Sequence, residues 1–356
     1  MIYLLTTSEH LCLEDFLSGR GAALAPELVP VPYSTLFGAR RLPQGTYIFA
    51  DLERLSGEDL DRAARLWRQL ASWGPGVRLL NDPSRVKQRF ELLRALHEHG
   101  LNEFDVYRLD EGRLPRRFPV FVRGERGHNA TASDLLPDEG ALRQFLCAWR
   151  ARGQGLGDTV VTEFCGERDE RGLYRRYAAF RVGERIVPTD IFFGRHWEVR
   201  GIGGGLVVDG QTVAEETRFL RDNPYEAQLR EVFDLACIDY GRVDYGVVGG
   251  RVQVYEINTN PYVAAGPLGG QDRAALYEHF ARDFLAALHI LGGPEGASPR
   301  AVRPSSGSLE RGRLRRWVRR ALYAALWRSG PAQAYARRLR LTRRLVRHGK
   351  RLLGQH

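Results

Sequence analysis

Cysteine is scarce in this chain, and its few copies are scattered. The 356 residues include four cysteines, at positions 12, 147, 165 and 237, and no two of them form a C-x-x-C pair. A zinc site built from thiolates, or a disulfide framework, needs cysteines that are closer together or more numerous. This usage fits a protein of the reducing cytosol.

Long apolar runs are missing as well. No stretch approaches the roughly 18 apolar residues that indicate a membrane-spanning helix. The first residues, Met-Ile-Tyr-Leu-Leu-Thr-Thr, have neither a basic start nor a long apolar core, so we expect no signal peptide. The sequence therefore predicts a cytoplasmic protein.

Lysine is nearly absent, and charge is unevenly distributed. Of the 53 basic residues only Lys87 and Lys350 are lysine, and all others are arginine. Residues 300–356 hold seventeen basic residues and one acidic residue, which leaves residues 1–299 with a net charge of −6 in a chain of +10. The basic character of the protein thus comes from one terminal segment.

The most informative stretch is 242–261, where two runs rich in β-branched and aromatic residues flank a Gly-Gly pair. This pattern predicts a β-hairpin. Residues two apart on a strand share a face, so Arg242 lies beside Asp244, and Glu256 lies beside Asn258. Polar groups interrupt runs that otherwise resemble strands buried on both faces. This favours a functional site over the alternative, an ordinary edge hairpin with solvated acids.

The length of the turn decides whether the two polar pairs meet. A two-residue Gly-Gly turn would place Asp244 opposite Tyr255 and send Glu256 to the far face of the sheet. A three-residue loop with a bulge, 249–251, places Asp244 opposite Glu256. We predict the three-residue loop, because it gathers three hard oxygen donors in one place, as Mg²⁺ carrying phosphates requires.

This hairpin resembles the C-terminal signature of the ATP-grasp superfamily, in the style of D-alanine–D-alanine ligase. There, an Arg-Val-Asp strand precedes a Glu-(Ile/Val)-Asn-(Thr)-x-Pro strand, and both motifs occur here. The resemblance implies that Asp244, Glu256 and Asn258 hold Mg²⁺, with Mn²⁺ as the alternative metal. It also implies that Arg242 steadies the acylphosphate and the tetrahedral oxyanion.

Two basic residues match the phosphate-binding positions of that family. Lys87 opens a helix predicted between Pro83 and Gly100, and the resemblance implies that its ammonium reaches the ATP phosphates as a compact charge. The alternative is a solvated surface charge. Arg123 follows the predicted strand 118–122, where the family has a second lysine, and its guanidinium can pair with phosphate bidentately. The loop after Arg123 is bulkier than the glycine-rich loop of the family.

The stretch 159–166 resembles the family's hinge between two lobes, where backbone groups near a glutamate hold the adenine amino group. By this resemblance the adenine-binding residues are Glu163, Phe164 and Cys165. The polar run 167–172 predicts a turn. Within it, Asp169 and Glu170 are equal candidates for binding the ribose hydroxyls.

The order of the predicted elements fits an α/β and α+β chain with the ATP-grasp fold: a small N-terminal α/β domain, two nucleotide-clamping lobes and a basic amphipathic helical tail. The expected segments are 1–82 for the N-terminal domain, 83–159 for lobe A, 160–291 for lobe B with the metal hairpin, 292–308 for a linker and 309–356 for the tail. The expected strands are 1–5, 46–50, 77–80, 174–182 and 185–193, and the expected helices are 56–73, 215–236 with a break at 224, and 274–291.

The segment 309–356 shows apolar residues at helical spacing, flanked by arginines. A basic helix with Trp and Leu on its apolar face suits an anionic membrane surface, which is the favoured partner. The alternatives are nucleic acid and docking onto the body of the chain or onto the second copy of a homodimer. Membrane binding would place the protein peripherally at the inner face of the membrane.

Together these patterns predict an ATP- and Mg²⁺-dependent ligase. It would activate a small-molecule or peptide carboxylate as an acylphosphate and join it to an amine or a thiol. One alternative is an ATP-grasp-type kinase that phosphorylates a small or lipid-linked substrate. Another is a membrane- or nucleic-acid-binding protein with a degenerate nucleotide site.

Overall fold

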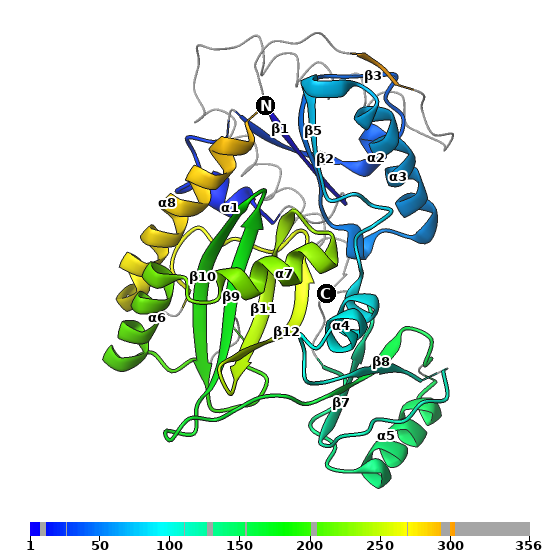
Figure 1. Cartoon of the computed structure of the whole chain (residues 1–356), viewed down its shortest axis with the longest axis vertical. Helices are drawn as coiled ribbons and strands as arrows, with labels where there is room; N and C mark the ends of the chain where they lie inside the picture. Colours follow the sequence, from blue (N-terminus) through cyan, green and yellow to red (C-terminus); the bar gives the residue numbers. More distant parts are fainter. Residues whose placement is uncertain are drawn as a thin grey trace, which may run out of the picture.

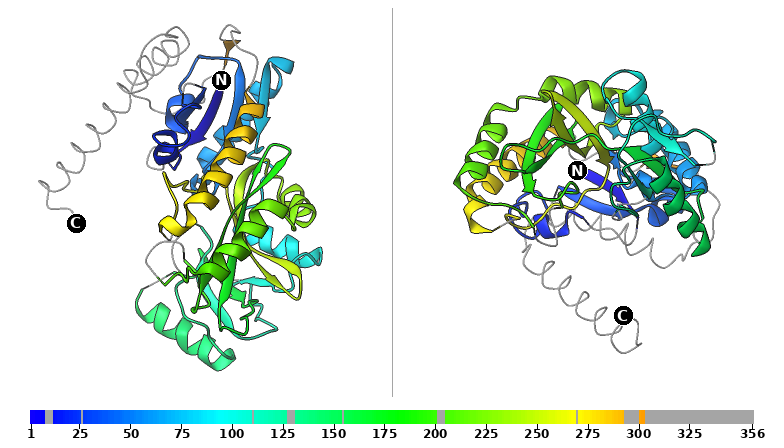
Figure 2. Two further views of the ribbon diagram at one scale, coloured as in Figure 1. Left: turned by 90° about the vertical axis from the view of Figure 1, so that its left-hand side faces the viewer. Right: turned by 90° about the horizontal axis from the view of Figure 1, so that it is seen from below.

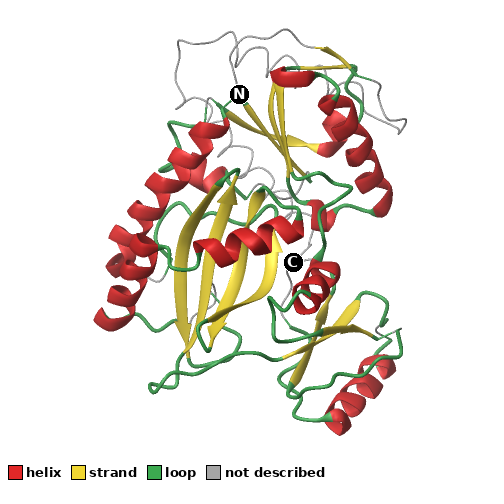
Figure 3. Cartoon of the chain, viewed as in Figure 1, coloured by secondary structure: helices red, strands yellow, loops and turns green. Residues whose placement is uncertain are grey.

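The structure is a computed structural model that describes residues 1–7, 12–25, 27–109, 111–126, 131–153, 155–200, 205–268, 270–292 and 300–302. The expected tail, 309–356, and most of the expected linker lie outside these residues, so the predicted helix and membrane binding of the tail stay predictions. The predicted α/β and α+β class is confirmed. One sheet is parallel, and helices flank two antiparallel sheets (Figures 1 and 3).

The N-terminal part of the chain forms a parallel sheet in the order β2-β1-β4-β5. Its strands are β1 (Ile2–Thr6), β2 (Leu28–Pro32), β4 (Gly45–Phe49) and β5 (Val77–Leu80). The sequence did not predict β2, which contains Pro30 and Pro32. Proline lacks an N–H donor and is tolerated at a sheet edge, and β2 is an edge strand.

Short elements and one long helix complete this part. The helix α3 (Gly57–Ala71) begins as expected, because the Ser56 hydroxyl accepts a hydrogen bond from the Asp59 N–H at 3.1 Å. The remaining elements are α1 (Glu14–Leu17), α2 (Tyr33–Leu36), and β3 (Arg41–Leu42) paired with β13 (Arg300–Ala301).

Lobe A contains a three-stranded antiparallel sheet in the order β6-β8-β7, with two helices. These elements are β6 (Val106–Arg108), β7 (Val120–Gly124), β8 (Thr159–Glu163), α4 (Arg89–Glu98) and α5 (Glu139–Ala151). The helix α4 begins later than the sequence predicted. Asp82 closes a turn instead, where its carboxylate accepts from the Ser84 N–H at 2.9 Å and its carbonyl accepts from the Val86 N–H at 3.1 Å.

Lobe B contains a four-stranded antiparallel sheet in the order β10-β9-β11-β12. Its elements are β9 (Tyr174–Val182), β10 (Arg185–Gly194), β11 (Tyr240–Val248), β12 (Arg251–Asn258), α6 (Gly210–Asp222), α7 (Glu226–Ala236) and α8 (Ala274–Leu291). The helix expected at 215–236 is interrupted near Pro224, where Asn223 takes a left-handed conformation. The bounds of α8 match the prediction.

The two faces of this sheet differ. On one face Tyr177, Val243 and Tyr245 pack with apolar side chains of α4, α6 and α7 in a shared core, and Figure 1 shows α7 across this face. The strands alternate, so the opposite face carries Asp244 and its charged neighbours. Helices α4, α6 and α7 therefore cover the apolar face, and the part of the opposite face around Asp244 is left to form a site.

The helix α8 joins the N-terminal sheet to lobe B. Its Phe280 and Phe284 contact Phe180 of β9, with ring centroids 6.1 and 4.6 Å away. The same core includes Ile2 and Leu4 of β1. Figure 2 shows α8 extending past both parts.

The buried side chain of Asn81 forms a second connection between the N-terminal sheet and lobe B. Asn81 has φ of 61° and no exposed surface. Its amide donates to the Phe49 carbonyl at 3.0 Å and to the Tyr240 carbonyl at 2.8 Å. Its Oδ1 accepts from the N–H groups of Asp239 and Tyr240, at 2.7 and 2.9 Å. The end of β4 is thus tied to the start of β11.

Candidate active site

The polar residues of the β11–β12 hairpin face one another. Arg242 pairs with Asn258, and Asp244 pairs with Glu256, in the antiparallel register. The register predicted from the sequence is therefore correct, and the hairpin's two carboxylates and its amide lie on one face of the sheet.

The predicted three-residue loop is wrong. Val248 pairs with Arg251, so the turn contains only Gly249 and Gly250, which have φ of 54° and 80°. Two positive φ angles define the tight turn whose twist matches a hairpin, and glycine adopts them without strain. The conformational preference of the Gly-Gly pair therefore decides the length of the turn.

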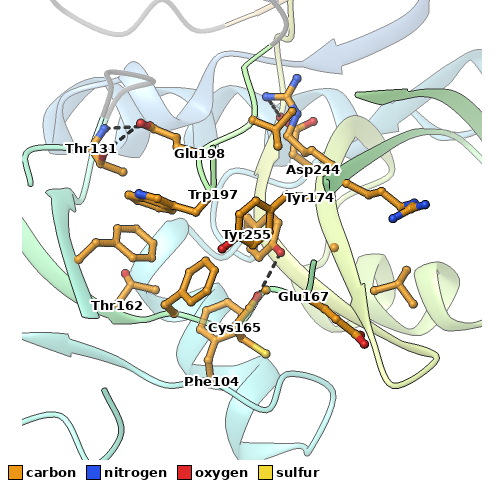
Figure 4. A pocket seen from close by; sticks show the side chains of 18 of the residues that line it. Phe104, Thr131, Thr162, Cys165, Glu167, Tyr174, Trp197, Glu198, Asp244 and Tyr255 are labelled. Atoms are coloured by element: carbon orange, nitrogen blue, oxygen red, sulfur yellow. Dashed lines mark hydrogen bonds and ion pairs between the residues drawn. The ribbon is translucent and has the colours of Figure 1, made fainter. Parts of the chain in front are cut away.

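A bulge on β12 restores the register. The pairing shifts between Asp244, which lies opposite Glu256, and Tyr245, which lies opposite Val254. Tyr255 is the extra residue, and its hydroxyl donates to the Cys165 carbonyl at 3.1 Å (Figure 4). Bulges reorient side chains near sites, and this one keeps Glu256 on the face of Asp244.

Two arginines share one oxygen of Glu256. The guanidinium of Arg89 lies 2.5 Å from Glu256 Oε2, and that of Arg123 lies 2.8 Å from the same oxygen. Burial and the neighbouring Arg123 lower the pKa of Arg89, an effect that Glu256 opposes. One carboxylate thus faces two cations, and the excess positive charge suits an anionic ligand.

A second group surrounds Asp244, which is only 3% exposed. Its Oδ1 accepts from Arg242 Nε at 2.9 Å, and Arg176 lies 3.6 Å from its Oδ2. The Oδ1 atom of Asn258 is buried and has no hydrogen-bond partner in the described part of the chain. Such an oxygen needs a ligand to satisfy it.

The donors of the hairpin fit a divalent cation. Two opposed carboxylates and an amide oxygen without a donor are the hard oxygen ligands that Mg²⁺ prefers. The described ranges contain no cluster of three His, Cys, Asp or Glu side chains suited to a metal. The third protein ligand would therefore be the amide of Asn258.

A pocket of about 410 Å³ opens between the two lobes. Its volume lies within the range of small-molecule sites. Of the predicted site residues, those that line the pocket are Arg123, Asp169, Asp244, Glu256 and residues 163–165 of the predicted hinge. Lys87, Glu170, Arg242 and Asn258 do not line it. Most of the expected nucleotide-binding residues are thus gathered around one space.

One side of this pocket is aromatic. The ring of Trp197 lies 5.0 Å from that of Phe121 and 5.8 Å from that of Phe164, between centroids. Tyr174 lies 6.1 Å from Phe164, and Figure 4 shows Trp197 and Tyr174 at the pocket. Aromatic walls of this kind accept a flat base.

The hinge residue Glu163 stabilises lobe A with its side chain. The side chain is 2% exposed and accepts from the Tyr107 hydroxyl at 2.9 Å and from the N–H groups of Arg116, Arg117 and Asp105 at 3.0–3.1 Å. The carboxylate is therefore fully engaged. The expected contact with adenine would fall to the backbone of 163–165, where the N–H groups of Glu163 and Phe164 already donate to the Asp105 and Pro119 carbonyls at 3.1 and 2.9 Å.

The two ribose candidates are placed differently. Asp169 lines the pocket, pairs with Arg175 at 2.9 Å and accepts from the Leu173 N–H at 2.8 Å. Burial opposes its ionisation, but these hydrogen bonds lower the pKa of Asp169 overall. Glu170 is exposed and does not line the pocket. Of the two, only Asp169 is positioned to reach a ligand there.

Lys87 does not line the 410 Å³ pocket, but it lines a smaller space together with Arg89 and Glu256. Its ammonium donates to the Leu235 carbonyl at 2.7 Å, and its N–H donates to the Ala236 carbonyl at 3.1 Å. These carbonyls end α7, where cations are stabilised. The cation that meets Glu256 at the start of α4 is Arg89 instead. In a chain nearly devoid of lysine, no sequence signal separated Arg89 from the other arginines.

No protein-family model and no curated protein matches the chain. Several solved structures are similar to it. The D-alanine–D-alanine ligase of Bacillus anthracis is 13% identical, with 82% of this chain and 98% of that chain covered and a TM-score of 0.45. An ATP-grasp RimK domain protein of Sphaerobacter thermophilus is 15% identical, with 82% and 100% covered and a TM-score of 0.44.

A third similar structure is the L-amino acid ligase of Bacillus licheniformis, at 12% identity, with 73% of this chain and 66% of that chain covered and a TM-score of 0.39. With identities of 12–15% and TM-scores below 0.5, these likenesses carry no argument about this chain. The roles of its residues must therefore be argued from the site. Among the described residues, no helix has both the length and the apolar character to cross a bilayer.

Proposed function

We propose that the chain is an ATP-dependent carboxylate–amine ligase whose nucleotide binds in the pocket between the lobes. The observation that carries this proposal is the convergence of Arg89 and Arg123 on one oxygen of Glu256, directly opposite Asp244. Cations in excess beside paired carboxylates suit a polyphosphate bound with a divalent metal.

The pocket residues, with Arg89 and Asn258 beside them, would divide the nucleotide between them. The base would lie against Trp197 and Phe121, near the hinge backbone, and Asp169 would meet the ribose. Arg89 and Arg123 would leave Glu256 to pair with phosphate oxygens, as planar guanidiniums do. Asp244, Glu256 and Asn258 would hold Mg²⁺, which would supply positive charge against the phosphates.

Arg242, which is bonded to Asp244, is the residue best placed to steady the transferred acyl group. The substrate carboxylate would attack the γ-phosphorus of ATP, which releases ADP and forms an acylphosphate. The amine would then attack the acyl carbon, and phosphate would leave. No activated Ser or Cys is required. Burial, the largest effect, raises the pKa of Cys165, so its thiol is a poor nucleophile.

The test measures ADP and free phosphate released by the purified chain with ATP, Mg²⁺ and mixtures of small carboxylic acids and amino acids. A ligase releases both in equal amounts with a condensed product, whereas a kinase releases ADP with a stable phosphorylated product. Asp244→Asn and Glu256→Gln should each reduce turnover at least a hundredfold.

A matched control is Glu184→Gln, which removes a carboxylate at the exposed tip of the β9–β10 hairpin. It should leave turnover unchanged. If Asp244→Asn and Glu256→Gln retain full activity, or if ATP does not bind the wild-type chain, the proposed site is wrong.

We also propose, from the sequence alone, that segment 309–356 binds anionic membranes and holds the enzyme at the inner face of the membrane. Full-length protein should sediment with vesicles containing phosphatidylglycerol at low salt and be released at high salt. A chain truncated after residue 308 should stay in solution. Equal sedimentation of both forms would overturn this assignment.

A further inference from the structure

A second, smaller pocket of about 50 Å³ lies beside the candidate active site. Arg242 lines this pocket, whereas Asp244 and Arg176 line the nucleotide pocket. Because Arg242 is bonded to Asp244 at 2.9 Å, this ion pair stands between the two spaces. A group held in the small pocket would therefore lie next to the proposed reaction centre.

Asp190 belongs to the same row of the sheet as the metal ligands. It pairs with Ala178 on β9, which pairs with Asp244 on β11, which pairs with Glu256 on β12. Paired residues share a face. Alanine is the smallest side chain in this row, so it leaves space between the carboxylates of Asp190 and Asp244.

A bulge directs two polar side chains into the small pocket. The register of β10 shifts between Pro188 and Asp190, so Thr189 is an extra residue there. Thr189 and Asp190 both line the pocket. The Thr189 hydroxyl oxygen and Asp190 Oδ1 are buried and lack hydrogen-bond partners among the described residues. Two unsatisfied polar atoms at one place point to a missing ligand.

Of the two carboxylates that line this pocket, Asp190 and Glu216, only Glu216 has an ion pair among the described residues. Glu216 pairs with Arg273, and Arg242 pairs with Asp244. Asp190 has no ion pair of its own among the described side chains of the pocket. Burial raises the pKa of Asp190, and the nearby Arg242, Arg176 and Arg273 oppose that shift. A buried polar atom without a hydrogen-bond partner is costly, and a bound ammonium group would give Asp190 Oδ1 the donor that it lacks.

The walls favour an organic cation over a metal ion. Phe180 and Phe280 line the pocket together with Tyr277. Aromatic faces attract ammonium groups and tolerate the carbon attached to them. A metal ion would need more oxygen donors than Thr189 and Asp190 supply. The volume admits only a few heavy atoms, so the group must be small.

We propose that this pocket binds the primary ammonium group of the amine substrate, with Asp190 as its anionic partner and Thr189 as a second hydrogen-bonding group. The substrate class is thus a small primary amine, such as an amino acid, whose nitrogen is held beside Arg242. The biological meaning rests on the proposed ligase function, but binding of the ammonium group is measurable without ATP.

The test titrates ethylammonium chloride into the full chain, followed by ligand-observed NMR, with potassium chloride and sodium acetate as comparison salts at equal ionic strength. Ethylammonium should bind the wild type. Asp190→Asn should weaken binding at least tenfold, and Thr189→Val about threefold. Glu184→Gln should bind like the wild type.

Three results would overturn the inference: no ethylammonium binding, equal displacement by potassium, or unchanged binding in Thr189→Val and a folded Asp190→Asn. Thr189→Val keeps the shape of a side chain that has no hydrogen bond to lose, so it tests the pocket even if Asp190→Asn does not fold. Ethylammonium binding in a chain without ATP turnover would leave this pocket intact and refute only the ligase function.

Discussion

Asp244 on β11 lies directly opposite Glu256 on β12, although the turn that joins their strands has only two residues. The register is corrected inside the strand, by the bulge at Tyr255. The Tyr255 hydroxyl is anchored to the hinge carbonyl of Cys165. The same residue thus sets the face of Glu256 and links β12 to the hinge.

Replacing Gly246 by alanine should disturb this arrangement. A Cβ at Gly246 would lie 2.1 Å from the Tyr255 hydroxyl oxygen, so Tyr255 must move and release Cys165. We expect ATP affinity to fall about tenfold and stability to fall by about 1–3 kcal/mol, as for other overpacked sites. Calorimetric titration and thermal unfolding measure the two effects.

The control for this change is Gly210→Ala at the start of α6, where a Cβ meets nothing within 4 Å. It should leave ATP affinity unaltered and not lower stability. Wild-type affinity in Gly246→Ala would show that the anchor of Tyr255 is irrelevant to the nucleotide.

Substitutions of Arg89 and Lys87 should have different effects, the first on ATP affinity and the second on the stability of the fold. Arg89→Ala removes a guanidinium proposed to meet phosphate, and loss of a charged hydrogen bond of about 1.5–3 kcal/mol predicts ATP binding weaker by roughly 10- to 100-fold. Lys87→Ala removes a contact to the end of α7 and should cost about 1 kcal/mol of stability without changing ATP affinity. Isothermal titration with ATP and Mg²⁺ checks both, and the reverse pattern would restore Lys87 to the phosphate site.

Asn81 should be among the most sensitive positions outside the pocket. Asn81→Gly removes four side-chain hydrogen bonds but accepts the left-handed backbone, and we expect a loss of about 4 kcal/mol. Asn81→Ala should lose about 1 kcal/mol more, because a Cβ strains that conformation. Urea denaturation of both variants measures the difference. Equal stability of Asn81→Gly and Asn81→Ala would show that the left-handed backbone at this position is not strained by a Cβ.

Stability should depend on pH through Glu216. Burial raises the pKa of Glu216 to about 7, although Arg273 opposes the shift. Because the folded form holds its proton more tightly, the contribution is full below the unfolded pKa and is lost as pH rises toward 7. The free energy of unfolding should fall by up to about 3 kcal/mol from pH 4.5 to pH 7.5.

Denaturation at several pH values tests this, with Glu216→Gln as the variant. The variant should resemble the wild type most closely near pH 4.5, where Glu216 is protonated, and its pH slope in this window should be flatter than that of the wild type. An equally steep slope would assign the pH dependence to another group. Glu226→Gln, an exposed change on α7, serves as the control.

The sequence alone determined the elements with strong local signals. Ser56 is a good helix cap, so α3 begins where predicted. The alternating strands β9 to β12 and the closing helix α8 follow from their periodicity. The strand β2 was not predicted, because its prolines are compatible with a strand only at a sheet edge. The start of α4 was predicted too early, because Asp82 forms a hydrogen-bonded turn there.

The hairpin residues Asp244, Glu256 and Asn258 could be named from their order in the chain, because strand alternation fixes which of them share a face. Only the tertiary structure decided that a bulge rather than a longer loop aligns them, and that Arg89 rather than Lys87 meets Glu256. It also revealed Asp190, which lies in one row of the sheet with Asp244 and Glu256 although these residues are far from it in sequence. Contacts between segments far apart in sequence depend on packing and burial, which local composition does not encode.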